Sequence, residues 1–489
     1  MSLLKPFRKV NFLAWFYRTY GAALSSTDSD VDWYSQSGTF HKTRSDPSEY
    51  LTSDDLVTYD PSTAYNLSSS RNLTVPIEDQ ACSFFFHHYV AEGNPSPNSR
   101  SSFLPILFNR QFSHRSAGNP LPAIITAIGM AGLSNVQNSA AGTIATRQKH
   151  SSVLRTLTAA LQDPETRTAD STLMAVMLLG TFEQVTCTNP QALKSWANHV
   201  TGAVAIARAR GQNQVQTEVG RDIFTHLRNQ IIIDCFQRDK AVPPEIMEWA
   251  DRALKFDNSK ANQRETELFK IIARLCNLRA AIHTSEGSSL KDPVVLSLAK
   301  DIDTDLSDFA NAIPPWLGYS LRTCRISENV FSDYYHVYPN TWVVGAWNMC
   351  RGARIMTQET ILDWLEHNPD YEGQDTQKRE CEILLGRLAA DICASVPFVL
   401  RDAEPEEDPL FRPQAVAGIA LVWPLYLTAT MDTATESTRA WVISRLDKLG
   451  HMMGIQQAVS LARVLRTQRT ITAWRRFEST RADEELVEW

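Results

Sequence analysis

The sequence is poor in glycine, with 20 glycines among its 489 residues. Sheets folded into sandwiches or barrels need many tight turns, so this scarcity favours helices. Phosphate-binding loops also depend on glycine, because their backbone amides must approach the phosphate closely. Neither a GxxxxGKS/T motif nor a GxGxxG motif after a predicted strand occurs. The sequence therefore argues against nucleotide binding through such a loop.

Closely spaced cysteines are also missing. The cysteines form no CxxC pair, whereas a structural zinc site needs thiolates a few residues apart. Most of them lie among apolar residues, as in IIIDCF, IARLCNL and WNMCR. We interpret them as buried thiols of a protein in a reducing compartment, and we predict no metal or other cofactor here. The eight cysteines are Cys82, Cys187, Cys235, Cys276, Cys324, Cys350, Cys381 and Cys393.

An acidic segment at 301–312 has part of the pattern of a cation site. Asp301, Asp303 and Asp305 have the spacing of a calcium loop, but Leu306 and Ala312 replace the glycine and glutamate that the loop needs. The second motif that would complete the magnesium site of a helical terpene synthase is absent. We expect these aspartates to lie on the solvated face of a helix.

Other catalytic motifs are lacking. The sequence contains neither GxSxG nor HExxH, and no serine or cysteine lies in a recognisable catalytic context. His87 and His88 are adjacent, and on a helix they point about 100° apart, so we do not expect them to share a metal ion. His199 is interpreted as a histidine of the core or its boundary. We predict that the chain is not an enzyme.

Charge and hydropathy argue against nucleic acid and membrane as direct partners of the body. The formal net charge is −7, whereas a broad DNA-binding surface is usually basic. The uncharged stretch 413–431 is almost long enough to span a bilayer, but it contains Pro424 and suits a buried helix better. A basic segment with Trp474 could touch phosphates, but acidic ADEELVEW follows it, which favours a solvated terminal helix. Its arginines are Arg463, Arg466, Arg469, Arg475 and Arg476.

Composition divides the chain into four parts. Residues 1–24 are basic and aromatic, which suggests a helix docked on the body or a transit peptide. Residues 25–80 are rich in Ser, Thr, Asp and Pro and indicate a weakly ordered connector. Residues 81–470 form the predicted helical body, and residues 471–489 form a tail.

The body shows repeated apolar spacing of the helical period and no convincing run of alternating strand residues. Helices are expected over 342–354, 361–365 and 382–396 among others. Helix starts are expected where a capping residue precedes proline, at Asp163, Asn189 and Asp292. The prediction is an all-α fold, an irregular assembly of roughly a dozen helices that is partly solenoid-like.

Several segments together resemble a known family. The stretch DSTLMAVMLLGTFEQVTCTNPQALKSWANHVTGAVAIARARG is similar to the start of the fungal-specific transcription factor domain. The segments IFTHLRNQIIIDCFQRDKAVPPEIMEWA, YPNTWVVGAWNMCRGARIM, DICASVPFVL, LVWPLYLTAT and HMMGIQQAVSLARVL follow in the family's order. The resemblance covers about residues 120–465. It identifies the chain as the regulatory part of a fungal zinc-cluster transcription factor.

The resemblance implies a nuclear regulator of metabolic or secondary-metabolite genes. Family members normally begin with a six-cysteine cluster that holds two zinc ions and reads DNA, but no cysteine precedes Cys82. DNA binding by this chain alone is therefore not expected, and zinc is expected only if such a cluster lies upstream. The expected partners are the transcription machinery or a DNA-binding protein, and a homo-oligomer is compatible with the sequence.

A mostly apolar pocket or partner groove would suit such a regulator. Trp342, Trp347 and Trp423 are candidates for this effector or partner surface, and core packing is the alternative role for all three. Two other functions stay open for the chain. A scaffold or adaptor outside the nucleus predicts stable partners and no effect on transcripts, and a helical enzyme predicts ionisable residues clustered in a pocket.

Overall fold

Helices in this protein begin at side chains that satisfy the first free backbone amides. Asp292 accepts a hydrogen bond from the Val294 amide, with Pro293 at the first helical position, as the sequence predicts. Asn340 caps another helix by accepting from the Val343 amide.

The structure is a computed structural model that describes residues 76–90, 104, 107–108, 118–187, 191–257, 259–285, 288–325, 327–401 and 413–467. The predictions for residues 1–24, for most of the 25–80 connector, for Asn189 and for the 471–489 tail concern residues outside these ranges.

The described residues form fourteen α-helices, so the all-α prediction is confirmed. The helices are α2 (Ile77–Tyr89), α4 (Pro120–Val136), α5 (Ala140–Gln162), α6 (Asp170–Thr186), α7 (Gln191–Arg210), α8 (Glu218–Gln237), α9 (Pro244–Leu254), α10 (Lys260–Thr284), α11 (Pro293–Asn311), α12 (Thr341–His367), α13 (Gln374–Leu400), α14 (Ala415–Thr430), α15 (Glu436–Met453) and α16 (Gln456–Thr467). Short 3₁₀ turns occur at η1 (Gly211–Val215), η2 (Ser288–Lys291) and η3 (Pro315–Leu317).

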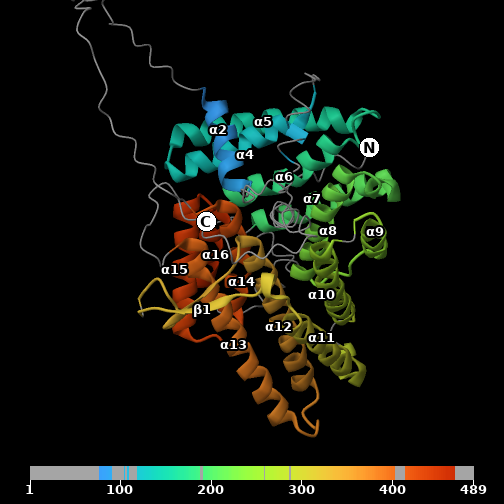
Figure 1. Ribbon diagram of the computed structural model, residues 1–489, viewed down its shortest axis with the longest axis vertical. Helices are drawn as coiled ribbons and strands as arrows, with labels where there is room; N and C mark the ends of the chain where they lie inside the picture. The colour runs from blue at the N-terminus through green and yellow to red at the C-terminus, as the bar shows by residue number, and fades with distance from the viewer. Residues whose placement is uncertain are drawn as a thin grey trace, which may run out of the picture. The chain divides into compact units, whose positions relative to one another are not determined.

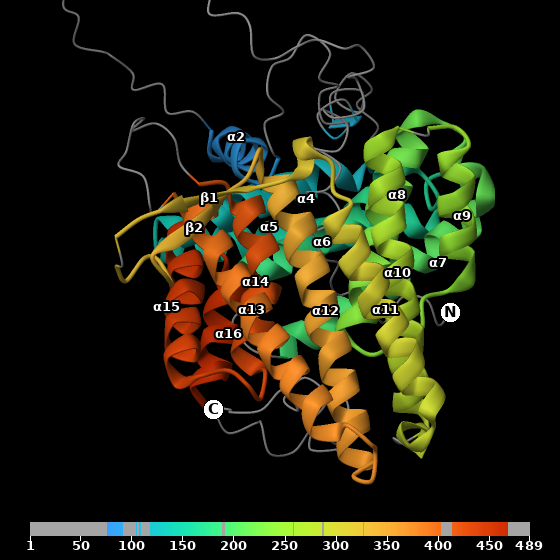
Figure 2. The ribbon, with the colours of Figure 1, turned by 60° about the horizontal axis from the view of Figure 1, so that its bottom comes forward.

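Consecutive helices are neighbours in space through most of the body (Figure 1). Helices α2, α4, α5 and α6 pack together, and α10, α11, α12 and α13 stand side by side (Figure 2). The last three helices return to the first ones, because α14 contacts α2, α15 contacts α4 and α16 contacts α6. Most of the buried apolar side chains between α2 and α16 join in one large cluster, and Val215, Phe224 and Ala250 form a second, small one.

A β-hairpin interrupts the helices, although the sequence analysis found no convincing strands. Strand β1 (Ser320–Thr323) pairs antiparallel with β2 (Tyr334–Val337), with Ser320 opposite Val337. The signal for β2 was the aromatic and β-branched run DYYHVY, which favours a strand but is too short to stand out. Strand β2 packs on α13 and so places aromatic side chains beside the long helices.

Two local predictions were wrong. Asp163 does not begin a helix, because it is the C-cap of α5 and its side chain accepts from the Glu165 amide in a turn that ends before α6. The residues after Pro164 are polar and give a new helix no face to bury. The predicted helices 342–354 and 361–365 are parts of one helix, α12, whose intervening residues such as Ile355 and Met356 are buried. Since α12 is covered on most sides, its apolar residues do not form one stripe.

Hydropathy alone does not separate the core helices from membrane spans. Among the described helices, α13 has the length and composition of a bilayer span, and 61% of its apolar window is buried inside the protein. Helix α14, which contains Pro424, is too short for such a span and nearly all of its residues are buried. Both helices therefore pack as core elements of the helical body.

Candidate functional site

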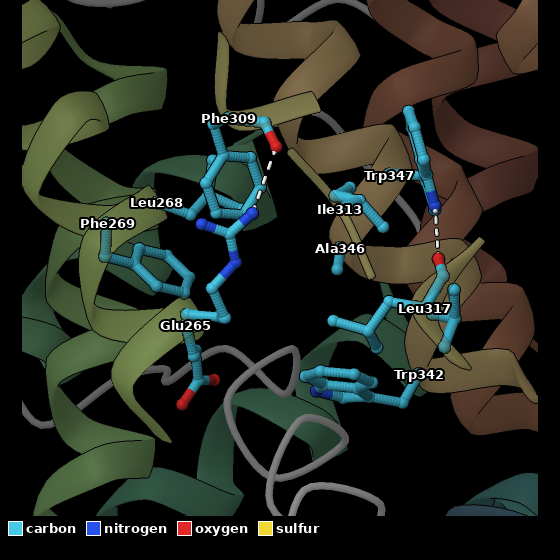
Figure 3. A pocket seen from close by; sticks show the side chains of 11 residues that line it. Glu265, Leu268, Phe269, Phe309, Ile313, Leu317, Trp342, Ala346 and Trp347 are labelled. Atoms are coloured by element: carbon cyan, nitrogen blue, oxygen red, sulfur yellow. Dashed lines mark hydrogen bonds between the residues drawn. The ribbon is translucent and has the colours of Figure 1, made fainter. Parts of the chain in front are cut away.

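A groove opens between α10, α11, α12 and the η3 turn, and its walls are mostly apolar (Figure 3). Its enclosed part is about 30 Å³, and it contains about 430 Å³ of empty space when its opening to solvent is included. The enclosed part has room only for water, so a larger molecule would lie in the open part of the groove. The lining residues are Arg264, Glu265, Leu268, Phe269, Phe309, Ile313, Leu317, Trp342, Val343, Ala346 and Trp347.

The groove brings together two of the three tryptophans that the sequence singled out. Trp342 and Trp347 come from the first turns of α12. Trp342 is 3% exposed, and Trp347 is half-buried with its Nε1 donating to the Leu317 carbonyl at 2.8 Å. In Figure 3 the Trp342 ring lies at the lower edge of the opening with its nitrogen directed toward the side of Glu265.

Trp423 lies apart from this groove. It belongs to α14, and its ring centroid is 5.9 Å from that of Tyr426 in the same helix. It is half-buried against the core and does not line the groove. The three candidate residues therefore do not form one surface.

Arg264 is a wall residue that the sequence analysis missed. Its guanidinium lies 4.6 Å from the centroid of the Phe309 ring. Its Nη2 donates to the carbonyls of Ala312 at 2.9 Å and Phe309 at 3.3 Å, and so caps the C-terminal end of α11. Its Nη1 donates to Glu267 at 2.7 Å. In the sequence, Arg264 lies among charged residues typical of an exposed helix face, and nothing there indicates the stacking on Phe309.

A buried ion pair lies behind the groove. Glu265 accepts from Arg228 Nη2 at 2.9 Å and from Asn229 Nδ2 at 2.8 Å. Arg228 also donates to the Thr266 hydroxyl at 2.9 Å. Both side chains of the pair are less than a tenth exposed, so breaking either one would leave a charge buried alone. The pair fixes α8 against α10 on one side of the groove.

Two nitrogen donors at the groove have no hydrogen-bond partner within the described part of the chain. They are Nε1 of Trp342 and Nε of Arg264, and both atoms are buried. An unpaired buried donor costs about 1–3 kcal/mol relative to its solvated state. Native proteins keep such groups satisfied by ordered water or by a ligand in most cases. These two nitrogens are therefore the polar features of the groove that call for an acceptor.

The groove adjoins a buried polar cluster centred on Arg351, which we call the Arg351 cluster. Its guanidinium lies between the rings of Tyr319 at 5.2 Å and Trp347 at 5.3 Å. Nη1 of Arg351 donates to the Tyr338 hydroxyl at 2.8 Å and to Asn348 Oδ1 at 2.9 Å. Trp347 therefore belongs both to the groove wall and to this cluster.

The cluster continues through His336 to α13. Nδ1 of His336 is 3.0 Å from the Tyr338 hydroxyl and 3.4 Å from Arg351 Nη2. Nε2 of His336 lies 3.6 Å from an Asp391 carboxylate oxygen, and Arg351 Nε lies 3.9 Å from the other. Because Arg351 is charged, Nδ1 acts as the acceptor, which leaves the proton on Nε2 facing Asp391. The cluster thus joins β2, α12 and α13.

Burial sets the charges in this cluster. Burial, with the positive charge of Arg351 beside it, lowers the pKa of His336 to about 3, so the imidazole is neutral near neutral pH. Burial raises the pKa of Tyr338 to about 12, although Arg351 acts in the opposite direction. Burial also raises the pKa of Asp391, again against the effect of Arg351. The arginine is therefore a fixed charge that lies beside a neutral imidazole and a neutral phenol.

The acidic residues and histidines considered for metal sites have other surroundings. Asp303 accepts from Arg354 at 2.8 and 3.0 Å, and Asp305 pairs with Arg274. The rings of His87 and His88 meet edge to face with centroids 4.8 Å apart. No group of three or more His, Cys, Asp or Glu side chains that could hold a metal ion occurs in the residues that the structure describes.

The structure therefore places a mostly apolar groove beside a buried polar cluster within one helical body. The family model of the fungal specific transcription factor domain matches residues 82–468. The chain belongs to this family, which confirms the resemblance seen in the sequence, and the family is one of transcription factors.

A curated relative agrees with this assignment. Transcription factor dbaG of Emericella nidulans is 29% identical to the chain over an alignment of 144 residues, and the match covers 27% of this chain and 32% of dbaG. The match therefore spans about a third of the relative's length. No solved structure matches the chain.

Proposed function

We propose that the chain regulates transcription in the nucleus, with metabolic or secondary-metabolite genes as its targets, and that it has no catalytic role. The observation that carries the proposal is the family match over residues 82–468, which includes nearly all of the described helical body. The name of the curated relative, a transcription factor, supports the same function. The mostly apolar groove suits a regulatory domain better than an active site, because its polar groups are few.

Contact with DNA is proposed to come through a partner. The chain has a formal net charge of −7, and such a balance does not favour a broad phosphate-binding surface. A DNA-binding protein or the transcription machinery would therefore bring this chain to its genes. Zinc enters the proposal only with a separate cysteine cluster, since the eight cysteines here are scattered.

An effector in the groove is proposed to control this activity. A ligand can shift a protein between two conformations only if it binds one of them more tightly. Trp347 connects the groove to the Arg351 cluster, because its ring lines the groove and lies beside the Arg351 guanidinium, which donates to Tyr338 directly after β2. Occupation of the groove would therefore change the environment of the Arg351 cluster.

The test uses the full chain fused to a heterologous DNA-binding domain and directed to a reporter promoter. A regulator should change reporter expression relative to the DNA-binding domain alone, and a fluorescent fusion should be nuclear. Deleting the gene in its own host should change transcripts of metabolic genes, and the intact gene should restore them. A stable fusion outside the nucleus that leaves reporter and transcripts unchanged would contradict the proposal and favour a scaffold or adaptor.

A further inference from the structure

We infer that the groove between α10, α11 and α12 binds a small, neutral, planar aromatic molecule that carries a ketone or quinone oxygen. The inference rests on the proposed function, because it names the chemical class of the effector. Three observations carry it: the shape of the apolar walls, the two unpaired donors and the balance of charge around them.

The walls favour a flat apolar body. The rings of Phe269, Phe309, Trp342 and Trp347 surround the groove, together with Leu268, Ile313 and Leu317 (Figure 3). Aromatic walls gain most from a second ring system, which can stack on one face and meet another edge to face. The small side chain of Ala346 in the wall of α12 leaves the space in which such a ring would lie.

The unpaired donors call for an acceptor oxygen. Trp342 Nε1 and Arg264 Nε can each donate one hydrogen bond and cannot accept, and neither has a hydrogen-bond partner among the residues that the structure describes. The remaining indole donor at the groove, Trp347 Nε1, is already bonded to the Leu317 carbonyl. A carbonyl oxygen has two lone pairs and can accept from a donor without bringing a hydrogen of its own.

The surrounding charges favour a neutral molecule. The charge of Arg264 is met by Glu267 at 2.7 Å, and the charge of Glu265 is met by Arg228 at 2.9 Å. The four charges cancel, so neither an anion nor a cation would find an unpaired counter-charge here. A carboxylate ligand would also lie near the buried carboxylate of Glu265, which disfavours it.

The size of the groove limits how deeply the molecule enters. The enclosed part is about 30 Å³, whereas the open groove has about 430 Å³ of empty space with its mouth included. A molecule of two fused rings would therefore reach the donors with its acceptor oxygen only, and its ring system would lie in the open part of the groove. Tight enclosure of a large ligand is not expected.

The experiment is equilibrium dialysis of the purified full chain against two probes of matched shape, 2-acetylnaphthalene and 2-ethylnaphthalene. The ketone should bind about three- to tenfold more tightly than the hydrocarbon, which is the effect of one net hydrogen bond. Trp342→Phe keeps a ring in the wall but removes the donor, so it should bring this ratio toward one. Ala346→Leu should weaken both probes because its side chain fills the space for the ring.

Trp423→Phe is the matched control, because it removes an indole outside the groove and should leave both affinities unchanged. Thermal unfolding followed by circular dichroism shows whether each variant is folded. The inference is overturned if neither probe binds, if Ala346→Leu binds both as well as the wild type, or if Trp342→Phe leaves the ratio unchanged. These results do not depend on the reporter assay, so a failed effector is distinguishable from a failed regulator.

Discussion

Arg351 of α12 contacts His336 of the hairpin, Tyr338 directly after it and Asp391 of α13. It is 3% exposed, and its hydrogen bonds to Tyr338 and Asn348 and its contacts with two aromatic rings satisfy a charge that burial would otherwise disfavour. Sequence alone could place Arg351 in a family motif and Trp347 four residues before it, one helical turn away. It could not show that the arginine is buried, since arginines are mostly exposed.

The first prediction concerns the removal of this charge. Arg351→Met should lower the free energy of unfolding by about 2–4 kcal/mol, because Tyr338, Asn348 and His336 lose their buried partner. Urea unfolding measured by circular dichroism gives the value. Arg387→Met on the exposed face of α13 is the control and should change stability by less than about 0.5 kcal/mol. Equal stability of the two variants would contradict the role given to the Arg351 cluster.

The second prediction concerns pH. The pKa of His336 is about 3 in the folded protein and 6.5 as its ordinary value, so between these values the unfolded state binds more protons. The contribution of His336 is therefore complete above about pH 6.5 and is lost as the pH falls. Asp391, whose pKa is raised, acts in the opposite direction because its folded state holds the proton more tightly.

Comparison with His336→Asn isolates this contribution. From about pH 7.5 to about pH 5, the free energy of unfolding of the wild type should fall by about 2 kcal/mol more than that of the variant. Urea unfolding at both pH values measures it. Parallel losses in the two proteins would show that the imidazole is protonated in the folded state as easily as in the unfolded state.

At the scale of elements, the sequence predicts helices well where one face is apolar and less well where a helix is covered on most sides. Helix α11 has a clear stripe, with Val295, Ile302 and Leu306 buried, and both its start and its apolar face follow the prediction. Helix α12 was predicted in two pieces because burial around its circumference removes the periodic signal. Close contacts between two crossing helices are even harder to predict from the sequence, because a single glycine can be enough to allow them.

Gly129 shows this at the crossing of α2 and α4. A Cβ atom at Gly129 would lie 1.9 Å from the Ala81 carbonyl oxygen, which is backbone and cannot move away alone. The third prediction is that Gly129→Ala separates the two helices and lowers the free energy of unfolding by about 1–3 kcal/mol. Gly386→Ala in α13 is the matched change, since its Cβ would meet nothing within 4 Å.

The two alanine variants should act in opposite directions. Gly386→Ala should stabilise the protein by about 0.5–1 kcal/mol, because alanine restricts the unfolded chain more than glycine does. Thermal and urea unfolding of both variants measure the signs. A stabilising Gly129→Ala would mean that α2 does not approach α4 as closely as the structure shows.

At the scale of the whole body, the chain closes on itself through contacts that sequence patterns cannot reveal. Asn135 in α4 donates to the Val185 carbonyl at 2.6 Å and to the Gly454 carbonyl at 3.0 Å. Ser460 in α16 donates to the Cys187 carbonyl at 2.9 Å. These partners lie up to 319 residues apart in the chain, and helical periodicity carries no information about such pairs. All-α character was therefore predictable, whereas the meeting of the first and last helices was not.

The fourth prediction follows from this closure: α4, α6, α15 and α16 should open as one cooperative unit. Hydrogen exchange of their buried amides should give similar free energies of opening. Asn135→Ala leaves the Val185 and Gly454 carbonyls without that donor, and it should lower these free energies together by about 1–3 kcal/mol. Asn311→Ala, at the exposed end of α11, should leave them unchanged. If Asn135→Ala speeds exchange in α4 alone, then α4 and α6 do not open together with α15 and α16. A conformational change at the groove would then be transmitted through α12 and α13 and would not involve the contacts between the first and last helices.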